Sequence, residues 1–143
     1  MLIHGQCHCG NISFELSWNP DPVEIPARKC DCSFCMKHGG VWTSNPQSSL
    51  IVSIGEPEAV SLYEFGTRTA QFQVCSRCGV VPLATCRIDG RLYAVVSCNA
   101  MQDIDPSLIR PAVASFGAEN VEGRLARRAR NWIGDVRFSD RMR

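Results

Sequence analysis

Apolar and polar residues alternate over short stretches through most of this 143-residue chain. In residues 12–16, Ile12, Phe14 and Leu16 share one face with polar residues between them, a period of two that is typical of a half-buried strand. Clusters of Gly, Pro and Asn separate such stretches. The pattern predicts strands at 2–6, 12–16, 41–43, 50–54, 59–65, 70–74, 80–87 and 91–97, and a short extended segment at 23–26.

Turn and helix signals complete the predicted elements. Asp89-Gly90, between two strand-like stretches, is a strong signal for a two-residue hairpin turn. Helical signals occur at 33–37, where Gly39-Gly40 ends the segment, and more weakly at 105–109 and 122–130. We therefore expect a mainly β fold of antiparallel sheets built from hairpins, with few short helices.

Composition narrows the class of protein. With 45% hydrophobic and 20% charged residues, the chain is typical of a soluble globular protein, and its length suits one domain over residues 1–143. No apolar run reaches the roughly 18 residues of a membrane helix, and the first four residues lead straight into a cysteine motif without a signal-peptide core. We expect a cytoplasmic protein without a membrane partner.

Nine cysteines are the most unusual feature of the composition. Because nine is odd, a pure disulfide framework would leave one thiol over. Seven of the nine occur in C-x-C and C-x2-C clusters, and no secretion signal is present. Both observations favour metal binding over disulfides.

Two cysteine pairs each end in a glycine: Cys7-His8-Cys9-Gly10 and Cys75-Ser76-Arg77-Cys78-Gly79. A loop that aims backbone amides at metal-bound sulfurs usually needs a residue tolerating positive φ after the second ligand, and glycine tolerates it at least cost. Two such loops supply four thiolates. We interpret Cys7, Cys9, Cys75 and Cys78 as one closed, structural zinc site.

The third cluster places Cys30, Cys32 and Cys35 within six residues. Three thiolates can occupy three corners of a tetrahedral metal site and leave the fourth open, as in reactive zinc sites. The alternative is a second closed site with a fourth ligand from the protein. Candidates for that ligand are His4, His8, His38, Cys86 and Cys98.

An open site of this kind has a chemical preference. Three thiolates give the Zn²⁺ centre a formal charge of −1, so the zinc is a weaker Lewis acid than in a three-histidine site. We therefore expect it to bind an incoming thiol as a thiolate and not to ionise water. Candidate cations for an anionic thiol are Arg28, Lys29, Lys37, Arg68 and Arg77, although each such residue is more often a solvated surface residue. Candidate pocket walls are Phe34, Trp42 and Tyr63, although aromatic residues of a β protein more often belong to its core.

Charge is uneven although the net charge is only +1. Seven arginines gather in a tail from about residue 124: Arg124, Arg127, Arg128, Arg130, Arg137, Arg141 and Arg143. We interpret this tail as a solvated and partly disordered end, with Trp132 packing it onto the body, and nucleic acid as an unlikely partner. The alternative for the tail is binding of nucleic acid or an acidic partner. For the whole protein, the alternatives to a reactive zinc site are a zinc-stapled module that binds protein or nucleic acid without turnover, and a thiol sensor whose central cysteines release metal and form disulfides under oxidant.

The three cysteine motifs together resemble the glutathione-dependent formaldehyde-activating enzymes, a family that includes centromere-protein-V-like proteins. The resemblance runs through Gly5 to Gly10, Cys30 to Lys37 with Gly39-Gly40, and Cys75 to Gly79. It implies a zinc-stapled β-tent fold. It also implies a carbon–sulfur lyase of the S-(hydroxymethyl)glutathione synthase type, acting on adducts of glutathione or a similar thiol with formaldehyde or another small aldehyde. In that reading Cys30, Cys32 and Cys35 bind a labile catalytic zinc.

Overall fold

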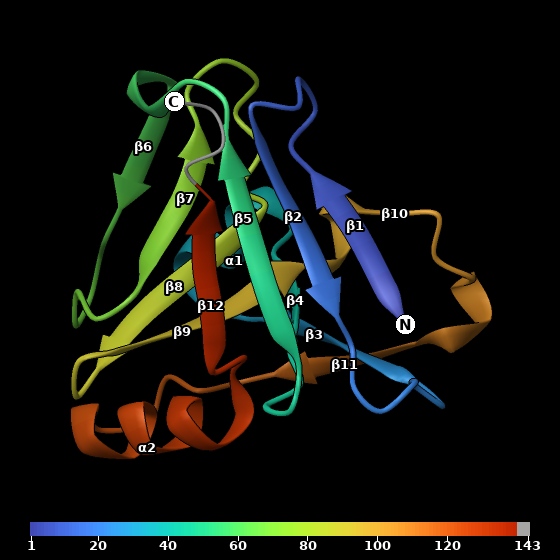
Figure 1. Ribbon diagram of the computed structural model, residues 1–143. Coiled ribbons are helices and arrows are strands. Elements are labelled where there is room, and N and C mark those ends of the chain that lie inside the picture. The colour runs from blue at the N-terminus through green and yellow to red at the C-terminus, as the bar shows by residue number, and fades with distance from the viewer. Residues whose placement is uncertain (140–143) are drawn as a thin grey trace.

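Two β-sheets pack against one another across a shared apolar core in the computed structural model, which describes residues 1–139 (Figure 1). The smaller sheet runs in the order β10 (Met101–Gln102), β1 (Leu2–Gln6), β2 (Ile12–Ser17), β5 (Ser49–Ile54) and β12 (Asp135–Ser139). The larger sheet runs β11 (Ile109–Ala114), β3 (Ile25–Cys30), β4 (Val41–Thr43), β9 (Arg91–Ser97), β8 (Leu83–Ile88), β7 (Gln71–Cys75) and β6 (Val60–Tyr63).

The main core consists of the inward-facing residues of both sheets. Ile12, Phe14 and Leu16 of β2 lie on its inner face, as their spacing predicts, and meet Leu83 and Val96 of the larger sheet. The two sheets therefore hold one another in place by burial of apolar surface. A second, smaller cluster contains Cys35, Trp42, Ala84, Cys86, Val95 and Trp132, and it lies beside the three-cysteine loop.

Helices are few and short: α1 (Ser33–His38), α2 (Val121–Asn131) and the 3-10 turns Pro57–Ala59, Cys98–Ala100 and Pro106–Leu108. The predicted mainly β fold with antiparallel pairing is confirmed, with one exception in each sheet. β11 pairs in parallel with β3, and β12 pairs in parallel with β5. Both exceptions lie at a sheet edge.

Individual elements follow the sequence pattern with local differences. The stretch 59–65 begins as a 3-10 turn and is a strand over Val60–Tyr63. The stretch 80–87 becomes a strand at Leu83, because the preceding residues close the second cysteine loop, with the Cys75 N–H donating to the Val80 carbonyl. The helix signal at 105–109 is a 3-10 turn that leads into β11.

The arginine-rich segment is folded as far as Ser139, unlike the partly disordered end expected from its composition. Asn120 caps α2 by accepting a hydrogen bond from the Gly123 N–H, and β12 then joins the smaller sheet. Trp132 is buried in the smaller apolar cluster with Trp42 and Val95, so it packs this segment onto the body, as expected. Arg141 and Arg143 lie outside the described residues. Within residues 1–139, each helix is too short or too polar to cross a membrane.

Candidate metal centres and their cavity

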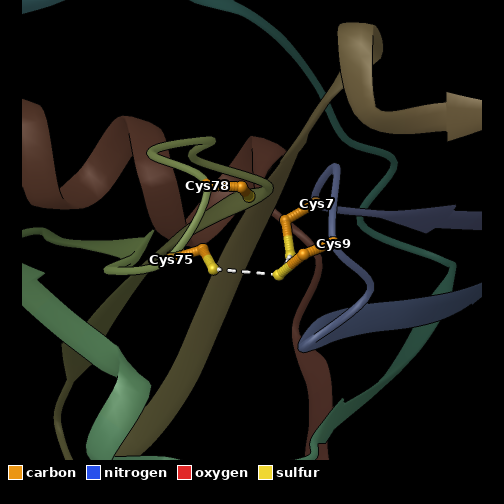
Figure 2. Close-up of side chains that lie close together, drawn as sticks. All are labelled: Cys7, Cys9, Cys75 and Cys78. Carbon is orange, nitrogen blue, oxygen red and sulfur yellow. Dashed lines mark hydrogen bonds between the residues drawn. The ribbon is translucent and has the colours of Figure 1, made fainter.

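The first cysteine group joins the two sheets at one end (Figure 2). Cys7 and Cys9 come from the turn between β1 and β2, and Cys75 and Cys78 come from the end of β7 and its following loop. All four sulfurs lie within 4.8 Å of one another. The fold therefore brings together the four residues that the sequence analysis assigned to one site.

Both loops have the backbone that a thiolate knuckle needs. Gly10 has φ of +85° and Gly79 has φ of +80°, so the expectation of positive φ after each second cysteine is confirmed. The Gly10 and Gly79 N–H groups donate to the carbonyls of Cys7 and Cys75, respectively. The Ile12 N–H also donates to Cys7 Sγ at 3.3 Å. Backbone donors aimed at sulfur stabilise a thiolate.

The sulfur spacing fits a tetrahedral zinc. Cys7 Sγ lies 3.8 Å from Cys9 Sγ, and Cys9 Sγ lies 3.5 Å from Cys75 Sγ. Four sulfurs at about 2.3 Å from zinc would stand about 3.8 Å apart. Burial raises the pKa of Cys7 to about 12. Burial also disfavours the Cys78 thiolate, but N–H donors from Cys9 and Val80 and thiol donors outweigh it and lower its pKa to about 6.

The second group is built around α1. Cys30 ends β3, Cys32 is the N-cap of α1, and Cys35 lies one turn into the helix. The Cys35 N–H donates to Cys32 Sγ at 3.3 Å, so an amide of the first helical turn faces a thiol. The three sulfurs lie within 4.8 Å of one another. Gly39, with φ of +72°, ends the helix as predicted.

A hydrogen bond joins the Cys30 and Cys35 thiols and shifts their pKa values in opposite directions. The Cys35 thiol donates to Cys30 and lowers the Cys30 pKa to about 6. The same hydrogen bond, together with burial, raises the pKa of Cys35. A bound metal requires all three sulfurs as thiolates, so metal uptake here would release protons.

Within residues 1–139, no further Cys, His, Asp or Glu joins this group within 4.8 Å. The possible fourth ligands lie elsewhere. The His38 ring packs against the Phe34 ring at a tilt, with centroids 4.3 Å apart, and His4 lies 3.8 Å from Glu15 across β1 and β2. Cys86 accepts a hydrogen bond from Arg128, and His8 and Cys98 stand outside the group. The donor set fits a zinc with three protein ligands and one open position.

The open side of the three-cysteine group lines a cavity of about 260 Å³. Of the three candidate walls, Trp42 lines the cavity, whereas Phe34 and Tyr63 do not. They instead belong to an aromatic cluster with Phe65 and Phe72, which do line the cavity. A small molecule bound in the cavity would therefore meet thiols and aromatic rings together.

Four arginines line the same cavity: Arg28, Arg124, Arg127 and Arg128. Of the candidate cations, Arg28 lines the cavity, whereas Lys29, Lys37 and Arg68 are exposed surface residues that do not line it. Arg77 instead pairs with Glu56 at the surface. The other three cavity arginines come from α2, which the sequence analysis interpreted as a solvated tail. Their spacing of three and four residues on one helical face was the signal that could have found them.

Comparisons with known proteins agree with this geometry. Residues 2–119 match the family described as "Glutathione-dependent formaldehyde-activating enzyme". A Halomonas elongata protein named "Putative glutathione-dependent formaldehyde-activating enzyme" is 32% identical over an 85-residue alignment, and the match covers 54% of this chain and 52% of the relative. The chain thus spans about half the length of that curated relative.

A solved structure supports the fold. The crystal structure of a Rhodobacter sphaeroides protein superposes with a TM-score of 0.56 at 33% sequence identity. The match covers 73% of this chain and 92% of that protein. With the family match spanning most of its length, this chain belongs to the glutathione-dependent formaldehyde-activating enzyme family.

Proposed function

We propose that this protein is a zinc-dependent carbon–sulfur lyase that joins or separates a thiol such as glutathione and the carbon of formaldehyde or another small aldehyde. One observation carries the proposal: the three sulfurs of Cys30, Cys32 and Cys35 have no fourth partner among the Cys, His, Asp and Glu side chains of residues 1–139, and they face a cavity. The family match supports the same chemistry.

The residues around the three sulfurs have positioning roles in this proposal. The Cys35 N–H holds Cys32 Sγ, and the Trp42 indole N–H holds Cys35 Sγ, so both sulfurs are oriented before any ligand arrives. Zinc bound there would supply a site at which an incoming thiol loses its proton and is held as a thiolate. The apolar walls, including Phe72 and Trp132, would exclude water from the adduct.

The reaction balances without an oxidant or reductant. In the forward direction a sulfur–carbon bond forms, the carbonyl π bond breaks, and the proton lost by the thiol ends on the new hydroxyl oxygen. In the reverse direction these changes are undone. The arginines of the cavity would favour an anionic thiol, because Glu119, which pairs with Arg127 and Arg124, matches only part of their charge.

The four-cysteine group has a structural role in the same proposal. Cys7 and Cys9 belong to the hairpin of the smaller sheet, and Cys75 and Cys78 follow a strand of the larger sheet. A zinc there would link the two sheets across almost seventy residues of chain, and structural zinc sites contribute on the order of 10 kcal/mol to folding.

The proposal is tested by exchange NMR. Carbon-13 formaldehyde and glutathione form their adduct spontaneously, so the exchange rate without protein is the baseline. We expect zinc-loaded protein to raise the rate above this baseline, Cys32→Ser to return it to the baseline, and Cys98→Ser, outside both cysteine groups, to keep the parent's rate. An exchange rate equal to the baseline with the zinc-loaded parent would overturn the proposal.

A further inference from the structure

α2 presents one face to the cavity, and that face is arginine-rich. Arg124, Arg127 and Arg128 line the cavity, while Arg130 on the same helix is exposed and does not. The family match ends at residue 119, before α2 begins. This wall of the cavity is therefore built from residues beyond the matched segment.

Arg128 is a buried cation without a carboxylate partner in residues 1–139. Its side chain is 8% exposed, and its Nη1 donates to Thr69 Oγ1 at 2.9 Å and to Cys86 Sγ at 3.4 Å. The guanidinium lies 5.0 Å from the centre of the Trp132 ring. Its Nε is buried without a hydrogen-bond partner. A buried guanidinium stays charged, and this one lines the cavity without a carboxylate partner in residues 1–139, so an anionic group bound in the cavity would balance its charge.

Arg124 and Arg28 extend the same wall. Arg124 Nη2 donates to the Phe116 carbonyl at 3.1 Å, and its Nε is likewise buried without a hydrogen-bond partner. Arg28 Nη2 donates to Ser44 Oγ at 2.6 Å, and Ser44 in turn donates to the Asn131 carbonyl at the end of α2. Through Ser44, the two hydrogen bonds connect Arg28 of β3 to the end of α2, which holds the arginines of this wall in set positions.

The carboxylates near this wall are too few to neutralise it. Glu119 bonds Arg127 through both oxygens, at 2.8 and 3.0 Å, and lies 3.7 Å from Arg124. Asp31 is the acidic residue among those that line the cavity. Two carboxylates therefore face four guanidinium groups, and the excess charge points toward the cavity that the cysteines also line.

We propose that Arg28, Arg124 and Arg128 form a carboxylate-binding subsite that selects an acidic thiol over a neutral one. The inference rests on the proposed function, in which the cysteine group takes the sulfur. Arginine binds carboxylates through paired N–H donors in a fixed plane, and such charged hydrogen bonds are strong where water is excluded. A tripeptide thiol with two carboxylates, such as glutathione, has the matching groups.

Binding of S-methylglutathione, measured by isothermal titration to the zinc-loaded protein, tests the subsite. Its sulfur carries a methyl group in place of the proton, so its affinity reports mainly on contacts away from the metal. We expect the parent to bind it at least about tenfold more tightly than its dimethyl ester. Arg124→Gln should lower the affinity for the diacid about tenfold and leave the diester unchanged, and Arg130→Gln should change neither.

Arg124→Gln suits this test because Arg128→Gln would also remove the contacts with Thr69, Cys86 and Trp132. If Arg124→Gln does not fold, the comparison of diacid with diester on the parent decides the matter. Equal affinity of the parent for both ligands overturns the subsite. If the protein catalyses exchange but binds diacid and diester equally, the proposed function stands and the subsite is wrong. If it prefers the diacid but does not catalyse exchange, the subsite stands and the proposed function is wrong.

Discussion

The indole N–H of Trp42 donates a hydrogen bond to Cys35 Sγ at 3.3 Å. Both residues are buried, Cys35 at 2% exposure and Trp42 at 7%. A buried N–H group pointing at a sulfur stabilises the thiolate and fixes its direction. The metal-binding ability of the three-cysteine group therefore depends on a strand residue that is not itself a ligand.

We expect Trp42→Phe to weaken Co²⁺ binding at the three-cysteine group by about 10- to 100-fold, because outer partners of metal ligands commonly contribute that much. Titration followed by the sulfur-to-cobalt charge-transfer absorption measures it. Trp18→Phe, which truncates a buried indole in the main core instead, is the control and should leave this affinity unchanged. Equal affinity of Trp42→Phe and the parent would show that the hydrogen bond has no such role.

Gly40 is needed for a different reason. A Cβ at this position would lie 2.9 Å from both Cβ and Sγ of Cys35 and 3.0 Å from Trp42 Nε1. We expect Gly40→Ala to displace the sulfur and abolish Co²⁺ binding at this group. Gly39→Ala is the matched control, because its Cβ would meet nothing within 4 Å and only the positive φ is strained, at a cost of about 1 kcal/mol. Normal Co²⁺ binding by Gly40→Ala would contradict the packing argument.

Cys75→Ser tests the four-cysteine group. Its sulfur is fully buried and lies 3.5 Å from Cys9 Sγ, so the change removes one ligand from the link between the sheets. We expect insoluble or protease-sensitive protein, since a large share of the folding free energy would be lost with the metal. Limited proteolysis checks this, with Cys98→Ser as the control. A Cys75→Ser protein that melts like the parent would rule the assignment out.

The ion pair of Glu119 with Arg127 makes the free energy of unfolding depend on pH. Its hydrogen bonds from Arg127 hold the pKa of the carboxyl below its ordinary value of 4.5. A carboxyl with a folded pKa below its unfolded value stabilises the protein above the unfolded pKa, and that contribution is lost as pH falls through the folded pKa. Glu119→Gln should therefore be less stable than the parent by about 1 kcal/mol at neutral pH.

Thermal unfolding of the parent and Glu119→Gln over a pH series measures this difference. The two midpoints should stand about 2 to 4 °C apart near pH 7 for a chain of this size and converge as pH falls below about 4.5. Glu122→Gln, an exposed residue in the first turn of α2, is the control for loss of a negative charge. A gap between parent and Glu119→Gln that is constant with pH would contradict the ion-pair argument.

Much of the fold and the cysteine grouping could be predicted because the signals are local. Strand alternation located β1, β2 and β9 with the same or nearly the same bounds. The Asp89-Gly90 turn was correctly predicted, and both residues have positive φ, at 50° and 80°. The cysteine loops were grouped by spacing and by their glycines, and the structure places each group's sulfurs together.

The rest depends on contacts between distant segments. β11 contains Pro111 and pairs in parallel with β3, so neither alternation nor a hairpin turn indicates it. That pairing ends with Ala114 opposite Cys30, and it returns the chain to the cysteine cavity just before α2. The placement of Arg128 in the cavity follows from this return and could not be predicted from the arginine content of the segment.

The central claim is that one cysteine group is closed and the other has a position for a thiol. The most direct test is the amount of zinc bound per chain, measured before and after zinc and glutathione are added. Free thiols are counted in the same samples. We expect one zinc to be held firmly, and a second to bind reversibly and more tightly when glutathione is present, with Cys32→Ser losing only the second. Two zincs held from the start, with no effect of glutathione on either, would contradict the claim.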